Sequence, residues 1–338
     1  MTASILSRPR LSLLDQTPLI EGHSVADAMA ATVELAQAAD DLGYHRYWCA
    51  EHHGSKGLAN PAPEVMVARL AAATKRIRVG SGGVMLPYYS PWKVAEQFLL
   101  LEALFPGRID LGLGRAPGSD RLTAQAVAGG VPNSDLFPQQ VQELAWLLAD
   151  TLPEGHPHHG LIMQPRPETR PELWMLGSSD FGGRLAAHLG INFCFAHFIN
   201  ADYGDQVARF YREQFRPGYE AKPYCAVALF VVCADTEREA EDLAAAVDLR
   251  RLNQAYGLNV AIPTIAQAKA ARYSAQDLRV IEGERARNII GTPDQVAARM
   301  LALQEQFIAD EIVVLTVAAS YQARLRSTQL LAEAFRGA

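Results

Sequence analysis

The chain has 338 residues, of which 49% are hydrophobic and 20% are charged, and this composition supports a large buried core and excludes a disordered chain. The net charge of −6, with dispersed lysines and arginines, argues against a nucleic-acid partner or an anionic membrane surface. The sequence has no apolar run of about 18 residues and no apolar signal-peptide core, so we expect a cytoplasmic protein.

Short apolar runs alternate with amphipathic segments along the chain. The predicted strands lie at residues 11–14, 44–50, 77–81, 108–113, 173–176, 191–196, 225–233 and 312–317. The predicted helices lie at residues 25–42, 63–75, 91–105, 138–148, 184–189, 205–215, 292–307 and 321–335. This order predicts an α/β fold of the (β/α)8 TIM-barrel type, formed as one domain by residues 1–338. A doubly wound sheet is the alternative, because short apolar strands look alike in both folds.

Several helices carry sequence signals at their ends. Ser24 and Thr292 are expected N-caps, and Gln295 completes a capping box with Thr292. Ser90-Pro91 offers a hydroxyl cap followed by proline at the first helical position. Gly43 is expected to end the first helix.

Two stretches interrupt the alternation. His156, His158 and His159 lie in a proline-rich link, where we expect a solvated loop because no carboxylate or cysteine stands in register to complete a metal site. Residues 255–285 form a long stretch after the seventh predicted strand. It is interpreted either as a lid over an active site or as an extra surface helix.

Polar residues and glycines follow the predicted strands at their C-terminal ends, where barrel enzymes carry their active sites. They are Asp15-Gln16, Glu51-His52-His53, Gly82-Gly83, Gly114-Arg115, Gly177-Ser178-Ser179 and His197. Each also has a purely structural explanation: Arg115, for example, has Asp110 or Asp120 available as a surface partner.

Together these residues suit a flat, phosphorylated cofactor. Gly82-Gly83 allow a ring to approach the backbone. Arg115 suits a phosphate, and so does the N-terminus of the helix after Ser178-Ser179, where Gly182 keeps the approach open. A histidine pair can transfer protons. Flavin mononucleotide (FMN) is a cofactor that would use all of these features. The glycines from Gly112 onward are spaced G-x-G-x-x-x-G and do not predict a dinucleotide site.

The run from Tyr47 to His53, YWCAEHH, resembles the W-x-x-E-H-H segment of the bacterial luciferase-like flavin monooxygenases. Further segments resemble this family in the same order. They are residues 78–87, 90–91 with 95–96, 106–115, 176–179 and 291–293. The matches extend over about residues 10–335 and are most similar to the single-chain oxidoreductases of the family whose substrates are not established.

The resemblance implies roles for individual residues. His52 matches the family's catalytic histidine, and Glu51 and His53 lie beside it. Gly82-Gly83 match a non-proline cis peptide that lies against the isoalloxazine ring. Arg115 and Ser179, with Ser178 beside it, match groups that bind the flavin phosphate.

Two positions depart from luciferase. Gly182 replaces a phosphate-binding threonine, so only its backbone N–H is available. Gly114 replaces a reactive cysteine near the flavin, and light emission is therefore not expected.

The resemblance also implies an activity. Reduced FMN from a separate flavin reductase would react with O2 to give a C4a-peroxyflavin, which transfers one oxygen atom to a small, aldehyde-like organic substrate. Residues 255–285 would be the mobile active-site loop. A homodimer would form through the helices at residues 63–75 and 91–104.

Other interpretations remain open at this stage. A metal-dependent hydrolase would use Glu51, His52, His53 and His197, although consecutive strand residues point to opposite faces and we expect no metal. A barrel that binds flavin without turnover is a second interpretation, and a deazaflavin in place of FMN is a third.

Overall fold

The structure, a computed structural model, describes residues 9–116 and 118–337. The expected domain of residues 1–338 therefore includes positions 1–8, 117 and 338, which lie outside the described residues. Parallel strands form a closed barrel that β1 to β7 and β9 complete, because β1 pairs with both β2 and β9, and β7 with both β6 and β9. They are β1 (Arg10–Asp15), β2 (Arg46–Cys49), β3 (Arg78–Met85), β4 (Ile109–Gly114), β5 (Glu172–Gly177), β6 (Asn192–Ala196), β7 (Cys225–Cys233) and β9 (Glu311–Leu315).

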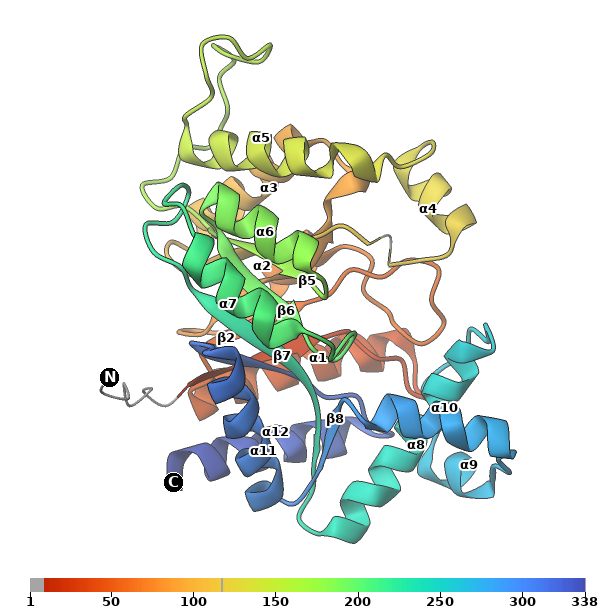
Figure 1. Cartoon of the computed structure of the whole chain (residues 1–338). Coiled ribbons are helices and arrows are strands. Elements are labelled where there is room, and N and C mark those ends of the chain that lie inside the picture. The colour runs from red at the N-terminus through yellow and green to blue at the C-terminus, as the bar shows by residue number, and fades with distance from the viewer. Residues whose placement is uncertain (1–8, 117, 338) are drawn as a thin grey trace.

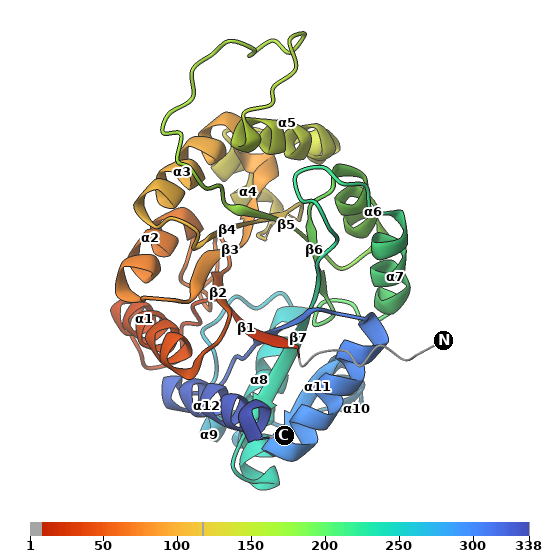
Figure 2. The same ribbon diagram turned by 90° about the vertical axis from the view of Figure 1, so that its left-hand side faces the viewer.

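Helices surround this barrel (Figure 2). Those that follow the sequence predictions are α1 (Val25–Leu42), α2 (Pro63–Ala73), α3 (Pro91–Leu104), α5 (Phe137–Ala149), α6 (Asp180–Leu189), α7 (Gly204–Gln214), α11 (Pro293–Phe307) and α12 (Tyr321–Gly337). The predicted (β/α)8 barrel is confirmed, and the doubly wound alternative is wrong because the sheet closes. None of the described helices has the length and apolar character needed to cross a membrane.

The sequence predictions did not place one strand and four α-helices, although the last two of these helices lie in the stretch at residues 255–285, where an extra surface helix was one interpretation. They are β8 (Asn288–Gly291), α4 (Arg121–Ala128), α8 (Glu237–Ala255), α9 (Ile265–Ala270) and α10 (Ala275–Arg285). Residues 230–233 of β7 pair with β8 beyond the part of β7 that pairs with β6, so β8 lies outside the closed barrel. In Figure 1, α4 and α8–α10 lie toward the right, around the C-terminal ends of the strands.

The stretch at residues 255–285 is more ordered than the expected lid loop, because it contains α9 and α10. Its first part is tied to neighbouring loops. The Asn259 amide donates to the Gly54 carbonyl, its oxygen accepts from the Lys56 N–H, and Ile262 pairs with Ile20. The stretch therefore has the helical secondary structure that the second interpretation, an extra surface helix, predicted.

Most of the predicted helix ends are confirmed. Ser24 and Asp27 form a capping box on α1, and Gly43 ends that helix with φ 82°. The Gln295 side chain accepts from the Thr292 N–H at 3.0 Å. Ser90 occupies the N-cap position of α3, but the expected hydroxyl cap is wrong because its side chain makes no capping hydrogen bond.

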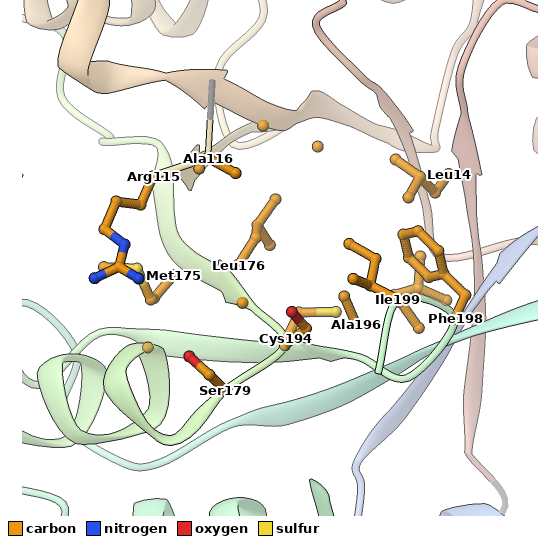
Figure 3. A pocket seen from close by; sticks show the side chains of 18 of the residues that line it. Leu14, Arg115, Ala116, Met175, Leu176, Ser179, Cys194, Ala196, Phe198 and Ile199 are labelled. Carbon is orange, nitrogen blue, oxygen red and sulfur yellow. The ribbon is translucent and has the colours of Figure 1, made fainter. Parts of the chain in front are cut away.

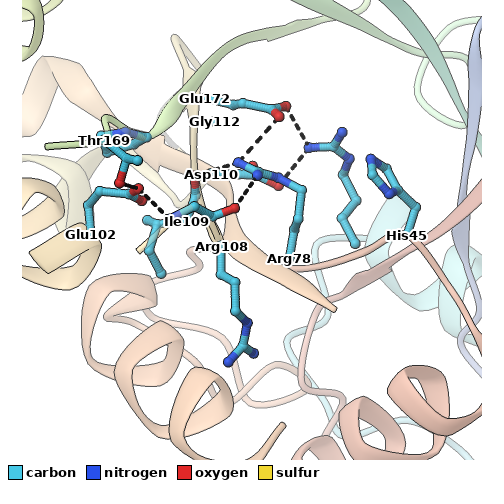
Figure 4. A network of polar contacts seen from close by, with 12 residues as sticks. His45, Arg78, Glu102, Arg108, Ile109, Asp110, Gly112, Thr169 and Glu172 are labelled. Atoms are coloured by element: carbon cyan, nitrogen blue, oxygen red, sulfur yellow. Dashed lines mark hydrogen bonds and ion pairs between the residues drawn. The ribbon is translucent and has the colours of Figure 1, made fainter. Parts of the chain in front are cut away.

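Charged residues fill the N-terminal end of the barrel. Arg46 begins β2 and is 1% exposed, and its guanidinium lies 2.7 Å from both Asp110 of β4 and Glu311 of β9. Arg78 pairs with Asp110 and Glu172, as Figure 4 shows. Strand starts meet at this end of a parallel barrel, which brings these distant residues together. Burial raises the pKa of Asp110, but Arg46 and Arg78 outweigh it and hold that pKa below its usual range.

The barrel above this layer is filled by apolar side chains. The indole rings of Trp48 and Trp174 meet edge to face with centroids 5.0 Å apart, and Trp48 Nε1 donates to Asp110. Alternate residues of each strand point inward and outward, so a second apolar cluster fills the space between strands and helices. Within the described residues the N-terminal end of the barrel is therefore filled, and the C-terminal ends of the strands are the open side for a ligand.

Candidate active site

A cavity opens at the C-terminal ends of the strands. All of the predicted cofactor-binding residues line it. They are Gly82, Gly83, Gly114, Arg115, Ser178, Ser179 and Gly182. Figure 3 shows Arg115 and Ser179 on one side of this cavity and Leu14, Phe198 and Ile199 on the other. The cavity thus has a polar end and an apolar end, as a ligand with a phosphate and a ring requires.

Gly82 and Gly83 are joined by a cis peptide bond, as the family resemblance implies. A Cβ atom at Gly82 would lie 2.6 Å from Leu14 Cδ1 and 2.9 Å from Trp48 Cβ. A Cβ atom at Gly83 would lie 2.6 Å from the Gly112 carbonyl oxygen. Both positions therefore require glycine, and their backbone forms part of the cavity wall.

The polar end of the cavity combines a free guanidinium with a helix N-terminus. Among the described residues no carboxylate pairs with Arg115, whose guanidinium lies 4.0 Å from the centroid of the Phe181 ring. Ser179 precedes α6 at the N-cap position, but its hydroxyl makes no capping hydrogen bond. The first N–H groups of a helix also lack internal partners, so this end of the cavity offers several donors to one anion.

The alternative partners proposed for Arg115 are occupied elsewhere. Asp110 belongs to the charged layer at the opposite end of the barrel. Asp120 accepts from the N–H groups of Leu122 and Thr123 at the start of α4. The structural explanation of Arg115 as a member of a surface ion pair is therefore wrong.

Gly112 and Gly114 of β4 lead to a test of the cavity wall. A Cβ atom at Gly112 would lie 2.3 Å from the Ser81 carbonyl oxygen. One at Gly114 would meet the flexible Met85 side chain at 3.2 Å and the Val84 carbonyl oxygen at an ordinary contact distance of 3.8 Å. We expect Gly112→Ala to lower the free energy of unfolding by about 1–3 kcal/mol or more, because a backbone must move. Gly114→Ala serves as the matched control, and urea denaturation that ranks the two variants in the opposite order contradicts this account.

Glu51, His52 and His53 do not line this cavity, although they follow β2 at the same end of the barrel. Glu51 is fully buried and accepts from Tyr89 at 2.6 Å and from the Met85 N–H at 2.8 Å. His53 Nε2 lies 2.7 Å from the same carboxylate. Glu51 thus joins the ends of β2 and β3 and orients His53.

His52 has different surroundings. Its Nδ1 atom is buried and has no hydrogen-bond partner among the described residues. Burial, followed by the nearby charge of Arg250, lowers the pKa of His52 to about 4. The imidazole is therefore neutral at neutral pH, and it is a weaker base than an exposed histidine.

The metal interpretation of the strand ends finds no support in the geometry. Within residues 9–116 and 118–337, Glu51, His52, His53 and His197 do not form a group of converging ligands. Glu143 does converge with His156 and His158, all ligand atoms lying within 4.8 Å of one another. The expectation that the histidine-rich link lacks a carboxylate neighbour is therefore wrong, because α5 places Glu143 beside it.

Sequence reasoning missed the supporting residues of the site. Tyr89 holds Glu51 from the segment after β3, and Phe181 lies beneath Arg115. Arg250 of α8 acts electrostatically on His52. A tyrosine, a phenylalanine and an arginine in these places carry no motif, since their roles depend on neighbours that only the folded chain supplies.

Comparisons with known proteins agree with the geometry. Residues 4–310 match the family model described as luciferase-like monooxygenase. An uncharacterized protein, YceB of Bacillus subtilis (strain 168), is 47% identical over 96% of this chain and 99% of its own length. The N-acetyl-S-alkylcysteine monooxygenase of the same organism is 38% identical, covering 96% and 98% of the two chains. The crystal structure of apo-MsnO8 superposes with a TM-score of 0.90 at 37% identity, covering 97% and 98%. The chain therefore belongs to the luciferase-like monooxygenase family.

Proposed function

We propose that the protein is an FMN-dependent monooxygenase that inserts one oxygen atom from O2 into a small organic substrate. The observation that carries this proposal is the cavity itself. On one side lie Arg115, which pairs with no carboxylate among the described residues, and Ser179, whose hydroxyl makes no capping hydrogen bond; an apolar wall lies opposite. The Ser179 hydroxyl and the N-terminus of α6 are unsatisfied donors that fit a phosphate. Family membership supports the same chemistry.

Each group of residues has a distinct task in this proposal. Arg115, Ser178, Ser179 and the N–H of Gly182 bind the phosphate, and the backbone of Gly82, Gly83 and Gly114 leaves room for the ring. The apolar side chains on the opposite wall exclude water from the reacting atoms. His52, neutral at neutral pH, accepts a proton beside the substrate, while Glu51 and His53 position the end of β2.

When bound, reduced FMN supplies two electrons, so that one atom of O2 enters the substrate and the other leaves as water. In this proposal a separate flavin reductase supplies the reduced FMN. An aldehyde-like substrate is the first class to test. A homodimer through α2 and α3 fits the exposed apolar side chains of Val65, Leu100 and Leu104 on these helices.

Arg115→Ala is expected to weaken FMN binding by roughly 10- to 100-fold, because a hydrogen bond between charged groups is lost. The measurement is a titration of purified protein with FMN and with chemically reduced FMN, followed by flavin absorbance. Arg184→Ala is the matched control, because Arg184 is an exposed arginine of α6 that pairs with Asp180.

Two outcomes of this titration would contradict the proposal. Wild-type protein that binds neither form of FMN removes the flavin assignment and directs attention to the deazaflavin. Equal FMN affinity of wild type and Arg115→Ala removes Arg115 from the phosphate site. FMN binding without O2 consumption, given a reductase and varied substrates, would instead indicate a flavin-binding protein without turnover.

A further inference from the structure

Arg250 is a buried cation without a counter-charge. It lies on α8 and is 5% exposed, and within the described residues its side chain makes no hydrogen bond and no ion pair. Its neighbour Arg251 differs, since it lies 3.7 Å from Glu284 and stacks on Phe230. Burying a charge without a partner costs folding free energy, so buried guanidinium groups are normally paired. The surroundings of Arg250 therefore lack one anion.

Arg250 lines a small cavity of about 30 Å³. The lining residues are Ser55, Gly57, Arg250, Gln254, Leu258, Asn259 and Val260, and none of them is acidic. Gln254 follows Arg250 by one helical turn, so both side chains lie on one face of α8. The Ser55 oxygen accepts from the Gly57 N–H, which leaves its own hydrogen to donate. These donors together suit a single carboxylate.

The same cavity adjoins the chain that carries His52. It lies between α8 and the loop after β2, and residues 258–260 close it on the outside. Asn259 fixes this closure through hydrogen bonds of 2.6 Å to Gly54 and Lys56. The charge of Arg250 also contributes, after burial, to the lowered pKa of His52.

We infer that Arg250 binds a carboxylate of the substrate, and that the protein therefore oxidises an organic acid. This inference rests on the proposed function, because it takes His52 as the residue beside the reacting part of the substrate. Burial, followed by the like charge of Arg251, lowers the pKa of Arg250 to about 9, which leaves the guanidinium charged at neutral pH. A bound carboxylate neutralises it through charge-assisted hydrogen bonds.

The test uses the flavin-free full-length protein and three probes, namely hexanoate, its uncharged analogue hexanamide, and acetate. Calorimetric titrations compare the wild type with Arg250→Met, which keeps the side-chain length, and Arg250→Lys, which keeps the charge. Arg238→Met on the exposed face of α8 is the matched control. We expect Arg250→Met to lose roughly tenfold or more in hexanoate affinity, while Arg250→Lys retains part of it. Hexanamide should bind weakly to all four proteins.

Stability gives an independent measurement. Without ligand, Arg250→Met should unfold at a higher urea concentration than the wild type, because an unpaired buried charge has been removed. Hexanoate should raise the unfolding midpoint of the wild type and leave that of Arg250→Met unchanged. An Arg250→Met variant that is less stable than the wild type and binds hexanoate equally well would overturn the inference.

The outcomes separate this inference from the proposed function. Hexanoate binding that depends on Arg250, in a protein that binds no FMN, would support the carboxylate site and contradict the flavin assignment. FMN binding together with equal hexanoate affinity in the wild type and Arg250→Met would overturn the carboxylate site alone. Equal affinity for acetate and hexanoate would show a site for a free small anion, and would also overturn substrate recognition.

Discussion

Replacement of His52 by alanine is expected to lower kcat by roughly 10²–10⁴-fold, the range found when a positioned acid–base group is removed. FMN affinity should stay at the wild-type level, because His52 does not line the cavity that holds Arg115 and Ser179. Its buried Nδ1 atom, which has no partner among the described residues, is the observation that supports a role in proton exchange during the reaction. Substrate-dependent O2 consumption, measured with a flavin reductase, gives kcat.

The pH profile adds a second measurement for His52. Because its pKa in the folded protein is about 4, the imidazole stays neutral as the pH falls from 8 to 5, and this residue contributes no inflection there. His188→Ala is the control for His52→Ala and should keep the wild-type kcat, since His188 is exposed in the last turn of α6. If His52→Ala turned over at the wild-type rate, the proton-accepting role would have to be assigned elsewhere.

Replacement of Asp110 by alanine should lower the free energy of unfolding by about 3–5 kcal/mol, since it leaves buried cations short of a partner. Asp110 is fully buried, forms ion pairs with Arg46 and Arg78, and accepts a hydrogen bond from Trp48 Nε1. Equilibrium urea denaturation at neutral pH measures the loss. The control is Asp235→Ala, which breaks an exposed pair with Arg326 and should cost far less, because solvent screens that pair. Similar losses in both variants would mean that the buried network contributes no special stability.

The pKa of Asp110 adds a pH dependence to this prediction. Since the folded-state pKa lies below the unfolded value of 3.8, the carboxylate stabilises the fold fully above that value. The contribution is lost as the pH falls through the lower folded-state pKa. Wild type and Asp110→Asn should therefore converge in stability as the solution becomes strongly acidic, and a constant difference would contradict this explanation.

Much of the barrel could be predicted because its strands and most of its helices have simple patterns. β7, for example, is a continuous apolar run that is buried along its whole length. α8 has no such pattern, because it packs against β7, β8, α9 and α10 and buries residues on several faces, including Asp248 and Arg250. β8 has four residues, too few to distinguish it from a loop.

The candidate site divides in the same way. Gly82-Gly83, Arg115 and Ser179 stand at strand ends, so position alone identified them before the cavity was known. Position also suggested Glu51 as a catalytic group, whereas the carboxylate is occupied by Tyr89, Met85 and His53. Arg250 was missed because its significance is the absence of a partner, and an absent contact leaves no trace in a sequence.

The extension of β7 beyond the barrel has an evolutionary consequence. Closure uses residues 225–230 of this strand, whereas its last residues hold β8 and, through it, the chain that contains α8, α9 and α10. Mutations, insertions and deletions in residues 234–287 can therefore accumulate without shifting the register of the closed barrel. This segment also supplies Arg250 and the residues around it. The surroundings of Arg250 can thus change while the register of the strands that hold the larger cavity stays the same.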